Sequence, residues 1–350
     1  MWAFINQLTI PLRPYTKKAP PGSIVFFECA EKQVEDAVLG NDSSSFNDLK
    51  LDPEIRPLQP DPRCTHCLEK LSEDVARMVG GKALIFQAHI RSETKTILAD
   101  AEKNGWSSPE TANEILRVIR GVSGVADPYK IFKATEMARA ELVFSQVKGR
   151  VPGDLRSSAN LALLGNSLDF FRSPDDALAG VSEQAENELV YFHDDLDRLR
   201  DFLAKKPGLV LYLTDNAGEV FFDFPLFQYI QNCASRTVLV VKGGPGLNDL
   251  TGVEFESVSI SGQFGETMDT GTDGAGVDWR HVSPEFASLA EEADLIVAKG
   301  MANFETVYFR ELTTPVFFLF RAKCHVVAEY FKAPMDGMIA LWKDDPNGKR

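Results

Sequence analysis

The chain has 350 residues, of which 44% are apolar and 25% are charged, and its formal net charge is −14. This composition is typical of a globular protein with a substantial buried core, and the length suffices for one large domain or two ordinary ones. The negative charge argues against a nucleic-acid partner, because a nucleic-acid footprint requires clustered Lys and Arg.

The first 62 residues predict an irregular N-terminal arm. Proline-rich stretches there flank the polar segment "LGNDSSSFND", and such sequences favour turns over helices and strands. The apolar start of the chain is not preceded by a basic region, and no run approaches the ~18 apolar residues of a membrane span. We therefore expect a cytoplasmic protein without a membrane partner.

Residues 63–206 predict a largely helical subdomain. Apolar residues recur at helical spacing in "CLEKLSEDVARMVGG", "PETANEILRVIRGVSG", "DPYKIFKATEMARAELVFSQVKGR" and "SEQAENELVYFHDDLDRLRDFLAKKPG". In the second segment Gly121 is expected to end the helix. In the fourth segment the spacing predicts one helix face made by Leu189, Phe192, Leu196, Leu199 and Leu203.

Residues 207–350 predict an α/β domain. The short apolar runs "LVLYLT", "TVLVVK", "DLIVAKG" and "PVFFLFRAK" alternate with helix-like stretches such as 217–232 and 284–292. Continuous apolarity is typical of strands that are covered on both faces, as in a parallel sheet. The alternation of strands and helices indicates a doubly wound α/β architecture.

Polar side chains follow each of these four runs, and in open α/β sheets ligands bind beyond the carboxyl ends of the strands. The residues at these ends are Asp215, Asn216, Glu219, Lys242, Asn248, Asp249, Lys299, Asn303, Glu305, Arg321, Lys323 and Cys324. Carboxylate and amide oxygens suit Mg²⁺ or Mn²⁺, whereas lysines and the N–H groups of a glycine-containing turn suit a phosphate. The set indicates metal-assisted phosphoryl transfer.

Each of these groups also has an ordinary structural interpretation. Asp215 and Asn216 could cap the helix that follows them, and Asn248 and Asp249 could form a plain turn. Lys299 and Lys323 could be solvated, as most lysines are. The catalytic interpretation therefore depends on all four strand ends taken together.

Several segments resemble the DUF89 family, the metal-dependent damage-control phosphatases. In family order they are "RCTHCLEK", "DPYK", "LLGNSLDFF", "TDNAGEVFFD", "VKGGPGLNDLT", "TGTDGAGVDWRHVSPEF", "DLIVAKGMANFETV" and "FRAKC". The similarity spans about residues 64–330. The first segment resembles the CxxC motif of the family branch that is typical of archaea and bacteria.

The resemblance implies a Rossmann-like three-layer α/β/α sheet domain with a largely helical N-terminal part. It implies hydrolysis of small phosphate monoesters, either sugar phosphates or damaged phospho-metabolites, with Mn²⁺, Mg²⁺, Co²⁺ or Ni²⁺ as cofactor. The implied metal ligands are Asp215, Asn216 and Asp249, with Lys323 as a further catalytic residue. The implied substrate residues are Glu219, Asn248, Asn303, Asn166 and Asp273, the last on a loop that could close over the substrate.

One departure concerns the Arg-Thr-x-Lys signature of another family branch, because Phe320 stands three residues before Lys323 and only the lysine carries over. In the expected mechanism Lys323 and backbone N–H groups near Ala217 and Gly218 hold phosphoryl oxygens. The nucleophile is either a water molecule or Asp215, which would then form an acyl phosphate.

Two other functions stay open. One is an S-adenosylmethionine-dependent carboxyl methyltransferase, which could share a Rossmann-like sheet, although no Gly-rich dinucleotide-type turn follows the first strand. The other is a non-catalytic metabolite-binding protein. Dependence of phosphate-ester hydrolysis on a divalent cation discriminates among the three.

The segment from Cys64 to Cys67 has the spacing of metal ligands, but a single CxxC is half of a zinc site. Cys29, Cys324 or His66 could complete it if the fold brings them close. A redox pair and plain packing are the other interpretations, since free cysteines are commonly buried.

Overall fold

The computed structural model describes residues 61–80, 83–150, 152–165 and 189–344. The predicted N-terminal arm lies outside the described residues except for its last two positions, and Pro62 already begins a helix. None of the helices formed by the described residues combines the length and the apolarity needed to cross a membrane.

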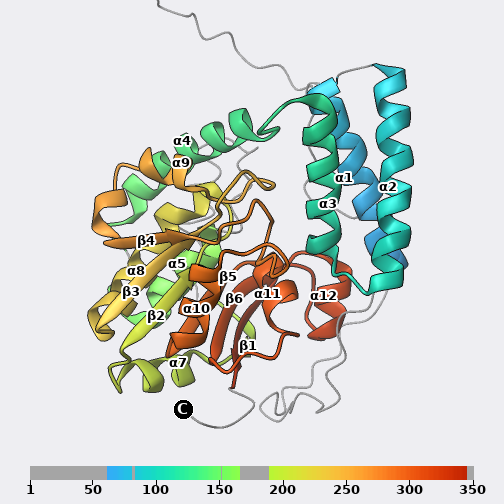
Figure 1. Cartoon of the computed structure of the whole chain (residues 1–350). Helices are drawn as coiled ribbons and strands as arrows, with labels where there is room; N and C mark the ends of the chain where they lie inside the picture. The colour runs from blue at the N-terminus through green and yellow to red at the C-terminus, as the bar shows by residue number, and fades with distance from the viewer. Residues whose placement is uncertain (1–60, 81–82, 151, 166–188, 345–350) are drawn as a thin grey trace, which may run out of the picture.

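A seven-stranded sheet forms the centre of the molecule, in the order β1-β7-β6-β5-β2-β3-β4 (Figure 1). The strands are β1 (Tyr191–Asp194), β2 (Leu209–Leu213), β3 (Arg236–Val241), β4 (Glu266–Asp269), β5 (Leu295–Lys299), β6 (Val316–Ala322) and β7 (Gly337–Lys343). Strands β2 to β6 are mutually parallel, β7 is antiparallel to β6, and β1 is parallel to β7. The four predicted strands are therefore adjacent, and their carboxyl ends share one edge.

The strand order contains a topological switch point between β2 and β5. After β2 the chain continues to β3 and β4 on one side, and it later returns to β5 and β6 on the other side. Connections that leave in opposite directions open a crevice above the two central strands, which is where doubly wound proteins bind ligands.

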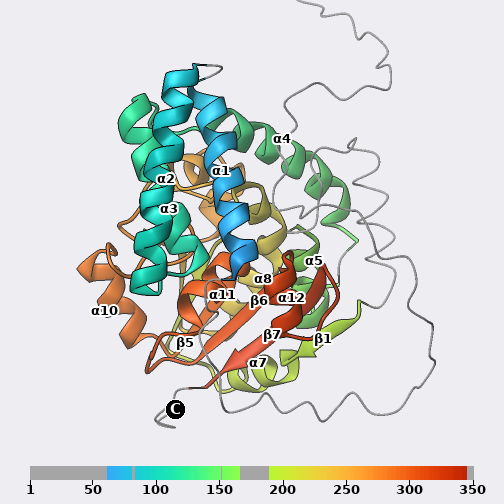
Figure 2. The same cartoon turned by 90° about the vertical axis from the view of Figure 1, so that its right-hand side faces the viewer.

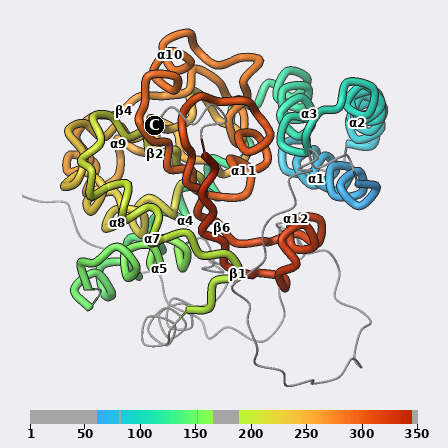
Figure 3. Tube along the Cα trace, turned by 90° about the horizontal axis from the view of Figure 1, so that it is seen from below, coloured from blue at the N-terminus to red at the C-terminus, as the bar shows by residue number. Residues whose placement is uncertain are grey.

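Helices cover both faces of the sheet (Figure 3). One face packs against α4 (Lys130–Val147), α5 (Leu155–Gly165), α7 (Leu196–Leu203), α8 (Val220–Cys233) and α9 (Gly252–Glu256). The other packs against α10 (Pro284–Glu292), α11 (Met301–Val307) and α12 (His325–Tyr330). In β2, Val210 and Tyr212 face the first layer while Leu211 and Leu213 face the second. This double coverage explains the continuous apolarity of the strands and confirms the predicted three-layer α/β/α fold.

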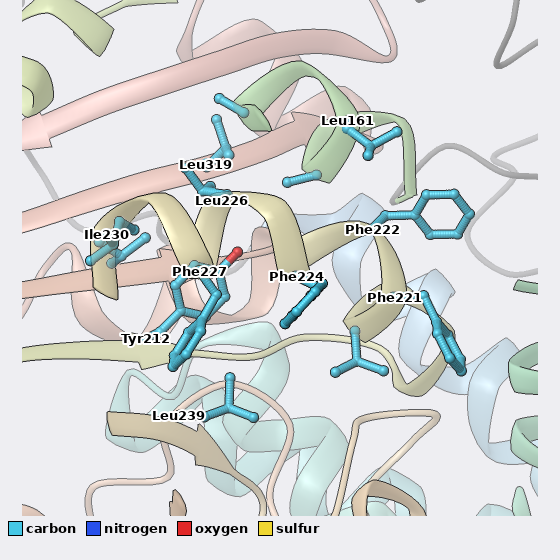
Figure 4. Packing of buried hydrophobic residues seen from close by; sticks show 14 of the residues in the cluster. Leu161, Tyr212, Phe221, Phe222, Phe224, Leu226, Phe227, Ile230, Leu239 and Leu319 are labelled. Atoms are coloured by element: carbon cyan, nitrogen blue, oxygen red, sulfur yellow. The ribbon is translucent and has the colours of Figure 1, made fainter. Parts of the chain in front are cut away.

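Helix α8 anchors the chain that follows β2. Its aromatic residues pack into the core, where Phe227 makes an edge contact with Tyr212 of β2 (Figure 4). Phe222 makes an edge contact with Phe144 of α4. Each such buried aromatic side chain stabilises the fold by about 1.5–3 kcal/mol relative to an exposed one. The helix therefore holds the turn between β2 and α8 in a rigid setting.

Three helices form a separate layer beside the sheet, with a small core of their own (Figures 1 and 2). They are α1 (Pro62–Gly80), α2 (Leu84–Asn104) and α3 (Ser108–Ser123). The predicted end of α3 at Gly121 is three residues too early. The residue that ends it is Gly124, whose φ of 70° is the left-handed conformation that closes a helix.

The prediction of a single helix from residue 189 onward is wrong. Residues 191–194 form strand β1, which pairs with β7, and helix α7 starts only at Leu196. Phe192, placed on the predicted helix face, lies in the strand and is 48% exposed. Backbone pairing at the sheet edge outweighs the local helical pattern here. The division of the chain at residue 206 stays a prediction, but β1, α4 and α5 all pack with the sheet.

Candidate active site

The carboxyl ends of β2 and β3 are joined by a short backbone ladder. Leu250 N–H donates to the Asp215 carbonyl, and Ala217 N–H donates to the Asn248 carbonyl, each at 2.9 Å. Asn216 and Asp249 are partners in the resulting antiparallel bridge. The ladder therefore brings the three predicted metal ligands onto two adjoining backbone segments, and their binding of a metal stays a prediction.

Asp215 is buried against the end of β5. Gly300, the residue after that strand, has φ 82° and ψ 163°, a conformation that only glycine adopts readily. A Cβ atom at Gly300 would lie 2.0 Å from Asp215 Oδ2. Glycine is thus required for two reasons, backbone conformation and space, and β5 closes one side of the Asp215 carboxylate.

Replacement of Gly300 by Ala is expected to lower the free energy of unfolding by at least about 1–3 kcal/mol, from backbone strain alone. It should also displace the Asp215 carboxylate and reduce any activity that depends on it. Chemical denaturation and a phosphatase assay measure the two effects. Gly252→Ala is the matched control, because no atom lies within 4 Å of its added Cβ. Equal stability of the two variants would contradict the proposed contact.

Lys299 is fully buried among acids and is not a solvated lysine. Its ammonium group donates to Asp223 Oδ1 at 2.6 Å, to Glu219 Oε2 at 3.3 Å and to the Ala162 carbonyl at 3.2 Å. Burial acts to lower the pKa of Lys299, but the charges of Asp223 and Glu219 outweigh it and raise that pKa above its ordinary value. Lys299 is therefore a charged counter-ion inside the protein.

Lys242 and Asn303 tie the strand ends together beneath the site. Lys242 Nζ donates to the Gly276 carbonyl at 2.6 Å and to Asn303 Oδ1 at 3.3 Å. Asn303 Nδ2 in turn donates to the carbonyls of Thr214 and Lys299. These contacts give Asn303 a structural role, while its predicted contact with substrate stays a prediction.

The acids at the strand ends crowd one another. Burial, followed by the charges of Glu219 and Asp249, raises the pKa of Asp215 well above its ordinary value. Burial also raises the pKa of Asp249, which the charge of Lys242 offsets only in part. Asp249 Oδ2 lies 3.6 Å from Lys242 Nζ and accepts no hydrogen bond. A positive charge near these oxygens would relieve the cost of burying them.

The composition of the site fits a divalent cation. Its buried acids are Glu136, Asp215, Glu219, Asp223 and Asp249, and its lysines are Lys242, Lys299 and Lys323. Five carboxyl groups against three ammonium groups leave a formal excess of two negative charges. The predicted ligands combine two carboxylates with an amide, which are hard donors. Within the described residues, no three His, Cys, Asp or Glu side chains form a metal-binding group by themselves.

Glu136 of α4 is a site residue that the sequence analysis missed. It is 5% exposed, and burial, followed by the charge of Glu219, raises its pKa to about 8. Its carboxyl group is hydrogen-bonded to the Asn248 side chain. The segment "DPYK", which resembles the family and lies just before Glu136 in the chain, is the nearest motif, but it does not identify Glu136 as a site residue.

The remaining predicted residues lie in different surroundings. Lys323 follows β6, is half-buried, and acts electrostatically on Asp215 and Glu136. Asp273 forms ion pairs with Arg117 and Arg120. Helix α5 ends at Gly165, and the next residue, Asn166, lies outside the described residues.

Asp273 lines a cavity of about 350 Å³ together with Arg117, Gly243, Thr272 and His281. Because Gly243 directly follows Lys242, this cavity lies next to the carboxyl end of β3. Its position is compatible with the expected loop over the substrate, and the substrate contact of Asp273 stays a prediction.

Cys64, Cys67 and Cys324 line a second cavity, of about 110 Å³, behind the end of β6. Burial raises the pKa of Cys324 to about 12 and raises that of Cys64 as well. The fold thus brings Cys324 to the CxxC segment, while Cys29 lies outside the described residues. Whether these cysteines bind a metal, form a redox pair or only pack stays a prediction.

The fold and the site define a doubly wound α/β/α protein with a cluster of carboxylates and lysines beyond its central strands. The chain belongs to the family described as the damage-control phosphatase ARMT1-like domain, whose model matches residues 61–339. This membership confirms the resemblance to DUF89 proteins, the family of its structural neighbour.

Two similar archaeal proteins are named damage-control phosphatases. "Damage-control phosphatase PH1575" of Pyrococcus horikoshii is 32% identical over 222 residues, 62% of this chain and 75% of the relative. A "Damage-control phosphatase" of Archaeoglobus fulgidus is 29% identical over 287 residues, 80% of this chain and 97% of the relative. These names support a phosphatase role in the family.

A solved structure shares the fold. The crystal structure of a DUF89 family protein from Pyrococcus horikoshii matches with a TM-score of 0.74 and 26% sequence identity. The match covers 81% of this chain and 98% of that protein. The described architecture is therefore that of the family.

Proposed function

We propose that this protein is a divalent-cation-dependent phosphatase that hydrolyses small phosphate monoesters, either sugar phosphates or damaged phospho-metabolites. The observation that carries the proposal is the backbone bridge between Asn216 and Asp249 beside the buried Asp215, at the switch point of the sheet. Membership in a family with relatives named damage-control phosphatases supports the same activity.

Asp215, Asn216 and Asp249 are the residues that would hold Mn²⁺, Mg²⁺, Co²⁺ or Ni²⁺. When bound, the cation supplies positive charge to the phosphoryl oxygens of the substrate. Lys323 supplies further positive charge to those oxygens as negative charge builds up in the transition state. Of the backbone N–H groups expected to bind phosphoryl oxygens, that of Ala217 already donates to the Asn248 carbonyl, and the role of the Gly218 N–H stays a prediction.

Two nucleophiles satisfy the balance of the reaction. If water attacks, its oxygen bonds to phosphorus, the ester P–O bond breaks, and the alcohol leaves with a proton. If Asp215 attacks, its carboxylate oxygen bonds to phosphorus as the ester P–O bond breaks and the alcohol leaves with a proton. Water then hydrolyses the acyl phosphate, which releases inorganic phosphate and restores the Asp215 carboxylate. The tight contact between Gly300 and the Asp215 carboxylate restricts the directions from which phosphorus can approach it.

Chelation is expected to abolish hydrolysis of p-nitrophenyl phosphate by the purified protein, and one or more of the four cations should restore it. The reason is that two buried carboxylates and the transferred phosphoryl group repel one another without a cation. Release of inorganic phosphate, followed for each cation with a panel of phosphorylated metabolites, measures the effect and ranks the substrates.

Three outcomes would contradict this proposal. Full turnover after chelation would remove the need for a cation. Methyl transfer from S-adenosylmethionine to protein carboxylates, without phosphate release, would favour the methyltransferase. Binding of phosphorylated metabolites without turnover would favour a non-catalytic binding protein.

The cytoplasmic location expected from the sequence stays a prediction.

A further inference from the structure

Helix α4 brings a fifth buried acid to the strand ends. Glu136 lies in the middle of that helix, and α4 packs against the 3₁₀ turn Ala217–Glu219, which directly follows the predicted ligands Asp215 and Asn216. Helix α4 thus reaches the segment that follows the end of β2.

Two contacts place the Glu136 side chain between the segments that carry the predicted metal ligands. A Cβ atom at Gly218 would lie 2.8 Å from Glu136 Cγ, so glycine is required there for Glu136 to pack. The Asn248 side chain is hydrogen-bonded to the Glu136 carboxyl group. Gly218 follows Asn216 by two residues and Asn248 precedes Asp249, so Glu136 touches both ligand-bearing segments.

One oxygen of this acid has no partner. Glu136 Oε2 is buried and accepts no hydrogen bond, although burying a carboxyl oxygen without a partner is costly. Lys133, on the same helix, shows the ordinary arrangement of a buried charge, because its ammonium group is ion-paired with Asp127 and Glu254. An acid that served only to pack α4 against the sheet would not need to leave an oxygen unpaired beside Asp249.

The balance of charge gives Glu136 a reason to be there. Among the described acids of the site, the other four exceed the three lysines by one negative charge. With Glu136 in its ionised form the formal excess is two, which equals the charge of a divalent cation. Lys133 is left out of this count together with the two acids that are ion-paired with it, Asp127 and Glu254.

We propose that Glu136 is an additional acidic residue of the cation site, and that its free Oε2 binds a water molecule of the cation held by Asp215, Asn216 and Asp249. No direct contact joins Glu136 to those three side chains among the described interactions, whereas Mg²⁺ in proteins keeps several of its waters. Glu136 is therefore a positioning residue, contributed by the helical layer. The inference rests on the proposed function, because it assumes the same cation.

The test is Mn²⁺ binding to the purified full-length protein without substrate, measured by isothermal titration calorimetry. Glu136→Gln keeps the shape of the side chain and removes its charge, and it is expected to weaken Mn²⁺ binding by about 10–100-fold, the usual effect of losing such a supporting group. Glu136→Asp keeps the carboxylate and should lose less affinity than E136Q. Glu141→Gln is the matched control, because Glu141 is exposed on the same helix.

Wild-type Mn²⁺ affinity in E136Q would overturn the inference and leave Glu136 as a packing residue, while the proposed function would stand. A wild-type protein that binds no divalent cation, yet hydrolyses phosphate esters, would instead overturn the proposed function. Circular dichroism verifies that each variant is folded. If E136Q fails to fold, Glu136→Ala replaces it, with the same expected loss of affinity and the same contradicting result.

Discussion

Replacement of Asp215 by Asn is expected to abolish phosphatase activity and to leave the fold intact. Asp215 lies at the switch point of the sheet, and its carboxylate is either a ligand of the proposed cation or the nucleophile itself. Under both mechanisms the variant loses a group that acts on the reacting phosphoryl centre. Such losses reduce kcat by about 10³-fold or more.

The fold should survive this change for an electrostatic reason. Burial and the neighbouring acids raise the pKa of Asp215, so the folded protein already disfavours a negative charge at this position. The Asn side chain has the same shape as Asp but no charge, so the substitution removes one carboxylate from a group of closely spaced acids. The Tm of Asp215→Asn is therefore expected to equal or exceed that of the wild type.

Measurement of kcat with the best substrate of the panel, together with thermal unfolding followed by circular dichroism, tests both parts. Asp201→Asn changes the net charge by the same amount at a site that is 74% exposed in its side chain, and it should leave both quantities unchanged. Wild-type turnover in folded Asp215→Asn would refute the assignment of the active site.

Replacement of Lys299 by Met should produce the largest loss of stability, about 3–5 kcal/mol, the usual cost of breaking a buried ion pair from one side. Met approximates the length of the lysine stem but leaves Asp223 and Glu219 buried without their ammonium partner. The removed contacts include the 2.6 Å bond to Asp223. Urea denaturation, with the midpoint and slope fitted separately, gives the free energy of unfolding.

A double variant isolates the electrostatic cause. In the double variant Lys299→Met with Asp223→Asn, only Glu219 is left buried without its ammonium partner, so part of the lost stability should return. Lys103→Met, at an exposed position of α2, is the control for loss of a lysine and should cost little. If Lys299→Met is as stable as this control, Lys299 does not compensate the buried acids.

Four of the five interior strands of the sheet were predicted from sequence, whereas β7 and the two edge strands were not. β2, β3, β5 and β6 are buried on both faces, and strands in this environment have continuous apolar sequences that can be recognised locally. β1 and β4 are short edge strands with half-exposed or exposed residues, so no such trace exists. Their strand conformation comes from backbone pairing with β7 and β3, which are distant in sequence.

The site shows the same division. Asp215, Asn216 and Asp249 could be proposed from sequence because each follows a recognisable strand, and position after a strand is a local property of the chain. Their role as metal ligands stays a prediction. Glu136 was missed because nothing in its own helix distinguishes it from an exposed acid. Only the packing of α4 against Gly218 makes it a buried one.

The sequence by itself determined that four covered strands alternate with helices and deliver acids, amides and lysines to their carboxyl ends. Those features depend on residues close together in the chain, where apolar periodicity and turn chemistry act. The tertiary structure alone decided which strand ends meet, that Asn216 is bridged to Asp249, that Gly300 packs against Asp215, and that Glu136 packs against Gly218. These contacts join segments remote in sequence, and their geometry is set by the order of strands in the sheet and by the helices packed on it.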